Sequence, residues 1–378
     1  MFEGQMDSVV DLIPVEGSLA SQVDRRMQSI VFGWLCLYLG VLVASFAIFE
    51  TLGPDQFDLH VFGRHILLCN LHSRLLHEGP TILLITPTIF AAELWLVGWS
   101  NSSLYRLTVG RQASSKTDIA YFISLHAGII EKVGVVLTFG MTLFVAEHLR
   151  DSLFRYSKYQ ISITSLPIFA QVLTFVIVYS FFDYWQHRID HHKIFWPLHR
   201  YHHAAEDFCT LNSSRVHPAA FSSALMSALI IILMKVSTEA LIDANLMLAT
   251  LRLLVHSRID SDFGWVGRYV IQSPRHHRLH HILDMSRPVG HYGLVPIWDH
   301  MFGTWRHSDI DQTLPIGVST PYRHGAWIGA DIWRDYCDFW TGVASSLLPT
   351  AGQGAQSAMA TRAELGSRPQ RDRILIDA

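Results

Sequence analysis

Histidine is the residue type whose number and spacing in this sequence could do chemistry. The chain of 378 residues has 22 histidines, and 15 of them fall between His187 and His307. Three motifs in this block have helical spacing: one HxxxH pair and two HxxHH clusters. They are His187 with His191, then His199, His202 and His203, and finally His277, His280 and His281. Because residues three or four apart share a helix face, each motif can point its imidazoles in one direction.

Eight imidazoles on three helix faces favour a metal site over simple packing. Imidazole binds iron, zinc, copper and nickel, and one tetrahedral zinc ion takes only four ligands. Eight ligands therefore predict two metal ions. Two redox-active irons would activate O2 beside an apolar substrate, and a neutral all-histidine shell leaves the cluster strongly positive. That charge suits the oxidation of an unactivated C–H bond.

The composition indicates that these motifs are carried by a membrane protein. Hydrophobic residues make up 50% of the chain, charged residues only 16%, and the mean hydropathy is +0.24, whereas soluble domains carry about 25% charged residues. These values argue against a disordered chain or an ordinary cytosolic enzyme. The net charge of −3 predicts no attraction to nucleic acid. Four scattered cysteines argue against a thiolate zinc site or a redox pair.

Six apolar stretches are candidates for membrane helices, which need about 20 mostly apolar residues. They are Ser29–Phe49, Pro80–Trp99, Ile119–Ala146, Leu166–Trp185, Pro218–Met234 and Leu241–Val255. The last two are short, and form either a hairpin that enters the membrane and returns or a pair of buried core helices. Four crossings and a returning hairpin would leave all histidine motifs on the N-terminal side. The flanking Arg25 and Arg26 favour the cytoplasm for that side.

The predicted fold class is all-α. We expect an integral membrane helical bundle of about four spanning helices plus a re-entrant or spanning hairpin, with a cytosolic histidine-rich helical cap that holds a dimetal site. The expected organisation has five parts. They are an N-terminal cytosolic segment (1–28), N-terminal membrane helices (29–165), a catalytic domain (166–310), a C-terminal interfacial segment (311–350) and a flexible tail (351–378).

The histidine motifs stand within longer signatures. These are DYWQHRIDH at 183–191, HRYHH at 199–203, SRVHP at 214–218, SPRHHRLHH at 273–281, HYG at 291–293 and WDHMFGT at 298–304. In order and spacing they resemble the fatty acid hydroxylase/sterol desaturase superfamily of membrane-bound non-haem di-iron lipid oxidases. The resemblance covers Asp183 to Trp305, roughly a third of the chain. It departs at His291, where the family usually has Asn or Asp.

The resemblance implies a metal centre with assigned ligands. The eight motif histidines would be iron ligands, and His217 and His256 would be further members of the set. For His217 the alternative is a position at the start of a helix before Pro218. The cofactor would be two Fe ions, with Zn as a substitute in purified protein, and O2 the co-substrate. A ligating histidine usually donates its second ring N–H to a carboxylate or carbonyl, so we expect Asp183 and Asp299 to support the ligands.

We therefore predict an O2-dependent oxidoreductase that hydroxylates or desaturates a C–H bond of a bilayer lipid, such as a sterol or a fatty acyl chain. The sequence has no His-Pro-Gly-Gly haem signature, glycine-rich dinucleotide fingerprint or cysteine cluster. The electrons should therefore come from a separate donor, either a cytochrome b5-like protein or a ferredoxin with its reductase.

Two other functions compete with this prediction. A histidine-rich membrane metal transporter needs polar groups along a path through the spans. A bis-histidine membrane cytochrome needs paired histidines across two spans. The clustering of histidines at helix ends on one side favours the oxygenase.

Overall fold

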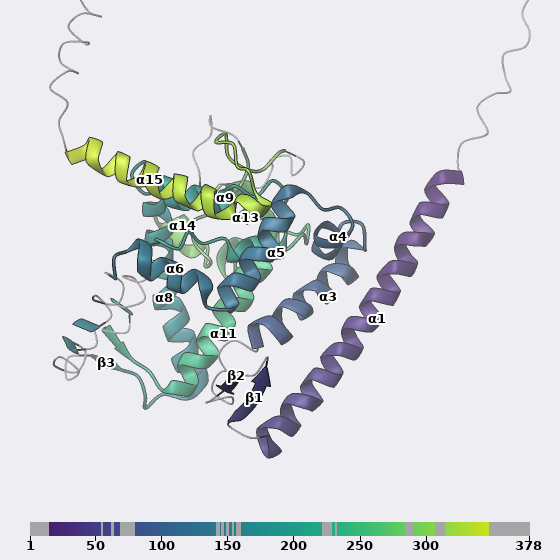
Figure 1. Ribbon diagram of the computed structural model, residues 1–378, viewed down its shortest axis with the longest axis horizontal. Coiled ribbons are helices and arrows are strands. Elements are labelled where there is room, and N and C mark those ends of the chain that lie inside the picture. Colours follow the sequence, from purple (N-terminus) through teal and green to yellow (C-terminus); the bar gives the residue numbers. More distant parts are fainter. Residues whose placement is uncertain are drawn as a thin grey trace, which may run out of the picture.

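The computed structural model is mostly helical, as predicted (Figure 1). It describes residues 15–53, 56–61, 64–68, 80–140, 144, 147–148, 151–152, 155, 160–220, 229–230, 233–283, 290–306 and 314–347. Within these residues lie two small two-stranded sheets that the all-α prediction did not include. Residues 1–14 of the predicted N-terminal segment lie outside the described residues, whereas 15–28 are helical, and the predicted tail lies entirely outside the described residues.

The first predicted span lies in α1 (Val15–Leu52), a long helix that stands along one side of the molecule (Figure 1). Its segment Ser21–Ser45 is long and apolar enough to cross a membrane, and the protein covers none of its most apolar window. Trp34 and Val41 leave more than half of their surface exposed. An apolar helix whose side chains stay largely exposed is typical of a segment that faces lipid.

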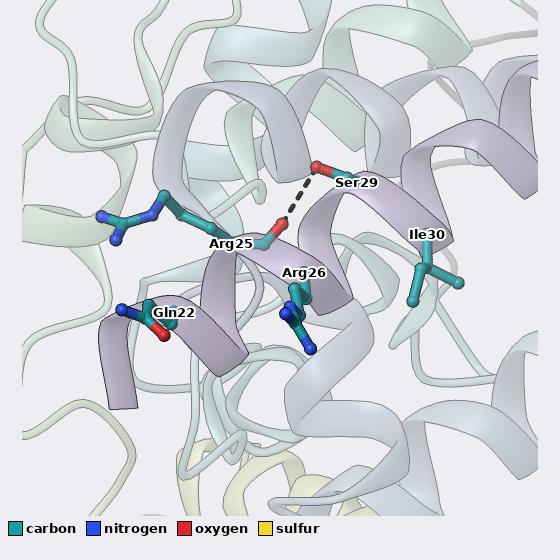
Figure 2. Close-up of a pocket in the computed structure, with 5 residues that line it drawn as sticks. All are labelled: Gln22, Arg25, Arg26, Ser29 and Ile30. Carbon is teal, nitrogen blue, oxygen red and sulfur yellow. Dashed lines mark hydrogen bonds between the residues drawn. The ribbon is translucent and has the colours of Figure 1, made fainter. Parts of the chain in front are cut away.

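Polar contacts tie the N-terminal part of α1 to α3 (Thr86–Val97). Gln28 Nε2 donates to the Leu94 carbonyl at 2.6 Å, and Asp24 Oδ1 accepts from the Ser100 N–H at 2.8 Å. A shallow hollow beside these contacts is lined by Gln22, Arg25, Arg26, Ser29 and Ile30 (Figure 2). Arg25 and Arg26 therefore lie at the N-terminal end of the apolar run of α1. This end of α1 is beside the C-terminal end of α3.

The connection after α1 is short and the next apolar stretches are broken. Strands β1 (Phe57–Val61) and β2 (Arg64–Leu68) form an antiparallel hairpin. A π-helical turn, η1 (Pro80–Ile85), then leads into α3, which is shorter than a span.

The predicted span Ile119–Ala146 is bent in the structure. It corresponds to the end of α5 (Ala113–His126) and to α6 (Ile129–Leu137), which meet at 84°. Gly128, with φ +70°, makes the break, because glycine adopts the left-handed region without steric cost. This pair is either a broken span or a re-entrant loop.

The fourth predicted span is α8 (Ile168–Asp190), the second described helix long and apolar enough to cross a membrane. It runs alongside α11 (Thr238–Val255) in the same direction. Strands β3 (Ile161–Ser162) and β4 (Met234–Lys235) precede the two helices and pair in parallel. A shared core joins them, composed of Val172, Phe175, Val176, Ala240, Ala244 and Leu248. Both helices therefore end in the same place.

The predicted hairpin partner of α11 is incompletely described, because most of 221–232 in Pro218–Met234 falls outside the described residues. The other described helices are short, apart from α15. They are α4 (Ser103–Thr108), α9 (Trp196–His203), η3 (Thr210–Ser214), α12 (Gly264–Tyr269), α13 (Pro274–His280), α14 (Ile297–Met301), η4 (Gly325–Trp327) and α15 (Ile328–Leu347). Helix α13 begins where the Ser273 hydroxyl accepts from the His276 N–H, with Pro274 in its first turn.

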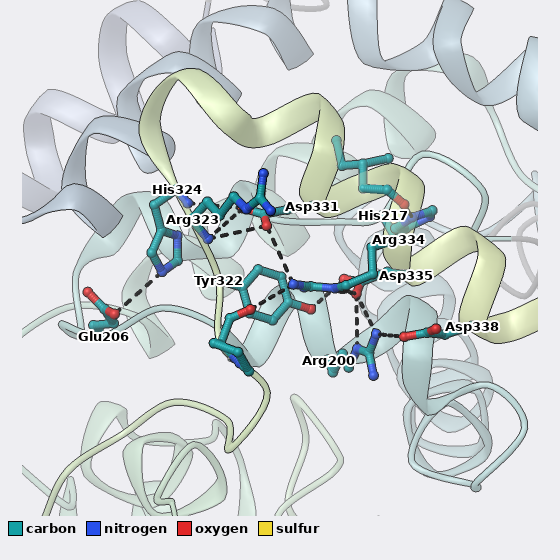
Figure 3. Close-up of polar contacts among 12 residues, drawn as sticks. Arg200, Glu206, His217, Tyr322, Arg323, His324, Asp331, Arg334, Asp335 and Asp338 are labelled. Atoms are coloured by element: carbon teal, nitrogen blue, oxygen red, sulfur yellow. Dashed lines mark hydrogen bonds and ion pairs between the residues drawn. The ribbon is translucent and has the colours of Figure 1, made fainter.

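The C-terminal segment packs across α9 (Figure 3). Arg200 of α9 donates twice to Asp335 of α15, at 3.0 and 2.7 Å, and Tyr322 donates to the same carboxylate. The chain that precedes α15 contacts the end of α13, where the Gly317 N–H donates to the His281 carbonyl at 3.2 Å. Part of the segment expected at the membrane interface thus braces both HxxHH helices.

Candidate metal centre

Nine histidines come together in two groups at the shared end of α8 and α11. The first group consists of His187, His191, His199, His203 and His280, and the second of His202, His256, His277 and His281. Within each group the candidate ligand atoms all lie within 4.8 Å of one another. The structure therefore brings the eight motif histidines and His256 together.

The two HxxHH motifs contribute to the groups in reciprocal ways. Helix α9 contributes His199 and His203, which are four residues apart, to the first group and His202 to the second. Helix α13 and its C-cap contribute His277 and His281, which are four residues apart, to the second group and His280 to the first. Side chains four residues apart point almost the same way, whereas the one between them is rotated around the helix. The rings of His203 and His281 stack with centroids 4.3 Å apart, so the two groups are in contact through this pair of rings.

The Nε2 atoms converge within each group. In the first group the His191 and His280 atoms are 3.1 Å apart, and those of His199 and His203 are 3.2 Å apart. In the second group the His256 atom lies 2.9 Å from that of His277 and 3.3 Å from that of His202.

The environment of these atoms also fits metal binding. The Nε2 atom of His187 is buried and has no hydrogen-bond partner among the described residues. Convergent, buried imidazole nitrogens fit one metal ion in each group, and imidazole suits iron, zinc, copper or nickel.

Backbone carbonyls orient three of these rings through the other nitrogen. The Nδ1 atoms of His187 and His280 lie 2.8 and 2.7 Å from the carbonyls of Tyr292 and Gly290, and His256 Nδ1 is 2.8 Å from the Arg252 carbonyl. A carbonyl only accepts hydrogen bonds, so each Nδ1 carries the proton. Each Nε2 then presents its lone pair to the group.

Asp299 holds the loop that supplies two of these carbonyls. Its carboxylate accepts from the N–H groups of Tyr292 and Gly293 at 2.9 and 3.0 Å, and from the Thr304 hydroxyl at 2.6 Å. Burial raises the pKa of Asp299, although these three bonds oppose the shift. Asp299 therefore supports the first group through the loop backbone. Asp183, the other predicted carboxylate, accepts from Arg252 at 3.1 Å.

Burial also sets the protonation of the ligands. It lowers the pKa values of His199, His202, His203 and His281 well below the usual range, and that of His256 to about 4. The neighbouring imidazoles act in the same direction, because two cations in contact repel each other. These rings are neutral at pH 7, as metal binding requires.

Two histidines that the sequence singled out lie elsewhere. His217 Nε2 is 3.0 Å from the Ile332 carbonyl, and its Nδ1 accepts from the Ala219 N–H at 3.1 Å, so the structure does not place it with either group. His291 is buried and stacks on His276, with ring centroids 5.3 Å apart. Its φ of +61° lies in the left-handed region, which Asn and Asp also visit because their short polar side chains hydrogen-bond locally.

Sequence reasoning missed Phe208, which packs against the second group. Its ring centroid lies 5.8 Å from that of His256, in a stacked arrangement, and 5.5 Å from that of His281. A phenylalanine in an apolar chain carries no distinguishing signal, and its position five residues after His203 was the only available clue.

The two adjoining histidine groups form a cluster that could hold metal ions. Residues 172–304 match the family model described as fatty acid hydroxylase. The relatives include ornithine lipid hydroxylase OlsE of Rhizobium tropici, 24% identical over 57% of this chain and 64% of that protein. They also include alkylglycerol monooxygenase of Danio rerio, 32% identical over 36% of this chain and 31% of that protein. Residues 172–304 therefore match a domain of the fatty acid hydroxylase type, in agreement with the resemblance that the motifs carry.

The match is confined to part of each protein. The chain aligns with just under two thirds of the ornithine lipid hydroxylase and about a third of the alkylglycerol monooxygenases, including 32% of the human one. No solved structure matches the chain.

Proposed function

We propose that this protein is a membrane-bound di-iron oxygenase that hydroxylates a C–H bond of a bilayer lipid with O2 and externally supplied electrons. The observation that carries the proposal is the convergence of nine imidazoles, five buried and four partly buried, into two adjoining groups. The first group would hold one iron and the second group the other. Bound iron would supply the activation of O2 and the oxidation of the C–H bond.

The side chains of the protein prepare the site for this chemistry. Carbonyls fix the tautomers of His187, His256 and His280, so that Nε2 lone pairs face the metal positions. Burial keeps the imidazoles neutral and excludes water from the oxidising centre. Without such exclusion, water would compete for positions that O2 and the substrate must reach.

A lipid substrate is favoured by the surface that leads to the site. Phe169 and Ile177 on α8 leave 73% and 53% of their surface exposed, on a helix apolar enough to span a membrane. Ile177 lies ten residues before His187, about 15 Å along the helix. An acyl chain that lies along α8 would therefore extend toward the first group.

Hydroxylation is favoured over desaturation by the names of the relatives, which are a lipid hydroxylase and monooxygenases. We propose that the protein crosses the membrane several times with the histidine groups on the cytoplasmic side. Arg25 and Arg26 at the same end of the molecule support this orientation. A separate cytochrome b5-like protein or ferredoxin would deliver the electrons.

Metal analysis and lipid mass spectrometry test the proposal together. Protein purified from membranes should contain two irons per chain and no Soret band. Lipids from cells that express it should include a species heavier by one oxygen atom, which is absent when His202→Ala is expressed. A haem spectrum, or identical lipids from both strains, would overturn the proposal.

A further inference from the structure

Glu93 is a charged residue in an otherwise apolar stretch, and neither the family match nor the proposed mechanism uses it. It lies on α3, in the N-terminal half of the chain, outside the family match at 172–304. Its side chain is completely buried. A buried carboxylate persists in a protein only where hydrogen bonds replace its hydration, so its partners show what it does.

Four hydrogen bonds converge on the Glu93 carboxylate. Ser103 donates its N–H to Oε2 at 2.7 Å and its hydroxyl to Oε1 at 2.8 Å. The Thr210 hydroxyl and the Arg258 N–H also donate to Oε1, each at 2.8 Å. The donors come from three segments that are far apart in the sequence, so one carboxylate joins them.

Two of these segments lead directly to the second histidine group. Arg258 is two residues after His256, and Thr210 is two residues after Phe208, whose ring stacks on His256. The Arg258 guanidinium joins the same two segments directly, because its NH1 donates to the Phe208 carbonyl at 2.9 Å. Glu93 therefore fixes both the backbone after His256 and the aromatic ring that covers it.

The first group is held by other means. His187 and His280 are oriented by the loop that Asp299 anchors, and Glu93 makes none of these contacts. We infer that Glu93 is a positioning residue for the second metal position alone. This inference rests on the proposed two-metal function, and it assigns a role at the centre to the N-terminal half of the chain.

Metal stoichiometry separates this role from general stability. The full-length protein in detergent would be loaded with Fe²⁺ anaerobically, and iron per chain would be measured. Wild type should hold two irons and Glu93→Ala about one. Glu131→Ala, which removes an exposed glutamate of α6, should still hold two.

Combined variants identify which position is emptied. With the first group disabled by His187→Ala and His191→Ala, adding Glu93→Ala should reduce the iron from one per chain to almost none. With the second group disabled by His256→Ala and His277→Ala, adding Glu93→Ala should change nothing. Thr210→Val removes one of the four bonds with little change of shape, and keeps the test available if Glu93→Ala does not fold. It should release the second iron to a chelator several-fold faster than wild type.

Two results would overturn the inference while the two-metal function stands. One is two irons in both Glu93→Ala and Thr210→Val, with chelator release as in wild type. The other is equal loss of iron from both groups in a folded, monodisperse variant. If wild type itself failed to load two irons, the proposed function would fall and the inference with it.

Discussion

The two histidine groups are built on similar frames but are completed differently. Helices α8 and α11 run in parallel, and each ends in a histidine C-cap, His191 in the first group and His256 in the second. One turn earlier α8 carries His187, whereas α11 carries Arg252 at the corresponding position. Arg252 is directed to Tyr179 and Asp183, so the second group has four imidazoles where the first has five.

The rings of the two groups are also held by different contacts. In the first group a loop anchored by Asp299 accepts from two Nδ1–H groups. In the second group the Nδ1 atoms of His277 and His281 have no hydrogen-bond partner among the described residues. Phe208 packs on its rings instead. The comparison teaches that backbone carbonyls orient two rings of the first group but only His256 in the second. In the second group, the packing of Phe208 and the hydrogen bonds of Glu93 supply the remaining support. A metal in the second group should therefore exchange more readily.

The largest expected effect comes from removing a ligand. His202→Ala deletes the contribution of α9 to the second group and should lower lipid oxidation at least about 100-fold, a loss comparable to or larger than that caused by losing supporting residues. The protein should remain in the membrane. His192→Ala, at an exposed neighbouring position, should keep its activity. Full activity of His202→Ala in the lipid mass spectrometric assay would refute the assignment of this ligand.

Breaking the loop should affect the first group selectively. Asp299→Ala removes the acceptor for the Tyr292 and Gly293 N–H groups, so the carbonyls that orient His187 and His280 lose their anchor. We expect about a 10- to 100-fold weaker first metal, measured by chelator competition, with the second metal retained. Asp260→Ala, at an exposed site, serves as the control. Preferential loss of the second metal would contradict the comparison.

Acid should destabilise the metal-free protein through the second group. The pKa of His256 falls from 6.5 to about 4 on folding because the ring is buried. Between these values the unfolded chain binds a proton that the folded chain does not, so the free energy of unfolding decreases as the pH falls from about 6.5 to 4. The loss is about 3 kcal/mol for this residue.

Thermal unfolding midpoints in detergent across this pH range test the acid prediction. His256→Gln should make the profile less steep by the share of one histidine, because the substituted side chain does not titrate while the other buried histidines still do. A midpoint that rises as the solution is acidified would show that the sign is wrong.

The smallest effect should follow from loosening the packing. Phe208→Leu removes the stacked ring from His256 but keeps an apolar side chain, at a cost of about 1–2 kcal/mol. Release of the second metal should become a few-fold faster, while the first metal is unaffected. Stopped-flow chelation measures both phases. Equal acceleration of both release phases would mean that the stacked rings of His203 and His281, rather than Phe208, limit release.

Local spacing in the sequence was enough to single out eight of the nine histidines that the structure brings together. Helical periodicity indicates that His187 can act with His191, and His277 with His281, because the helix itself fixes those geometries. It did not predict that His202 joins the group of the α13 pair or that His280 joins the group of the α9 pair. That division depends on how α9 and α13 pack against each other. The His-Pro pair at 217–218 looked like part of the same site, but His217 Nε2 faces the Ile332 carbonyl of α15, and its Nδ1 accepts from the Ala219 N–H. Glu93 was visible only as an isolated charge, since its partners are up to 165 residues away.

The parallel course of α8 and α11 has a consequence for how the centre forms. His191 and His280, whose Nε2 atoms touch, are 89 residues apart, and His202 and His256 are 54 apart. Contacts of high sequence separation form late and slowly, because a long loop must close before they are made. We expect the newly made chain to insert first and to acquire metal last. Metal content would then report the fraction of molecules in which the whole domain has folded.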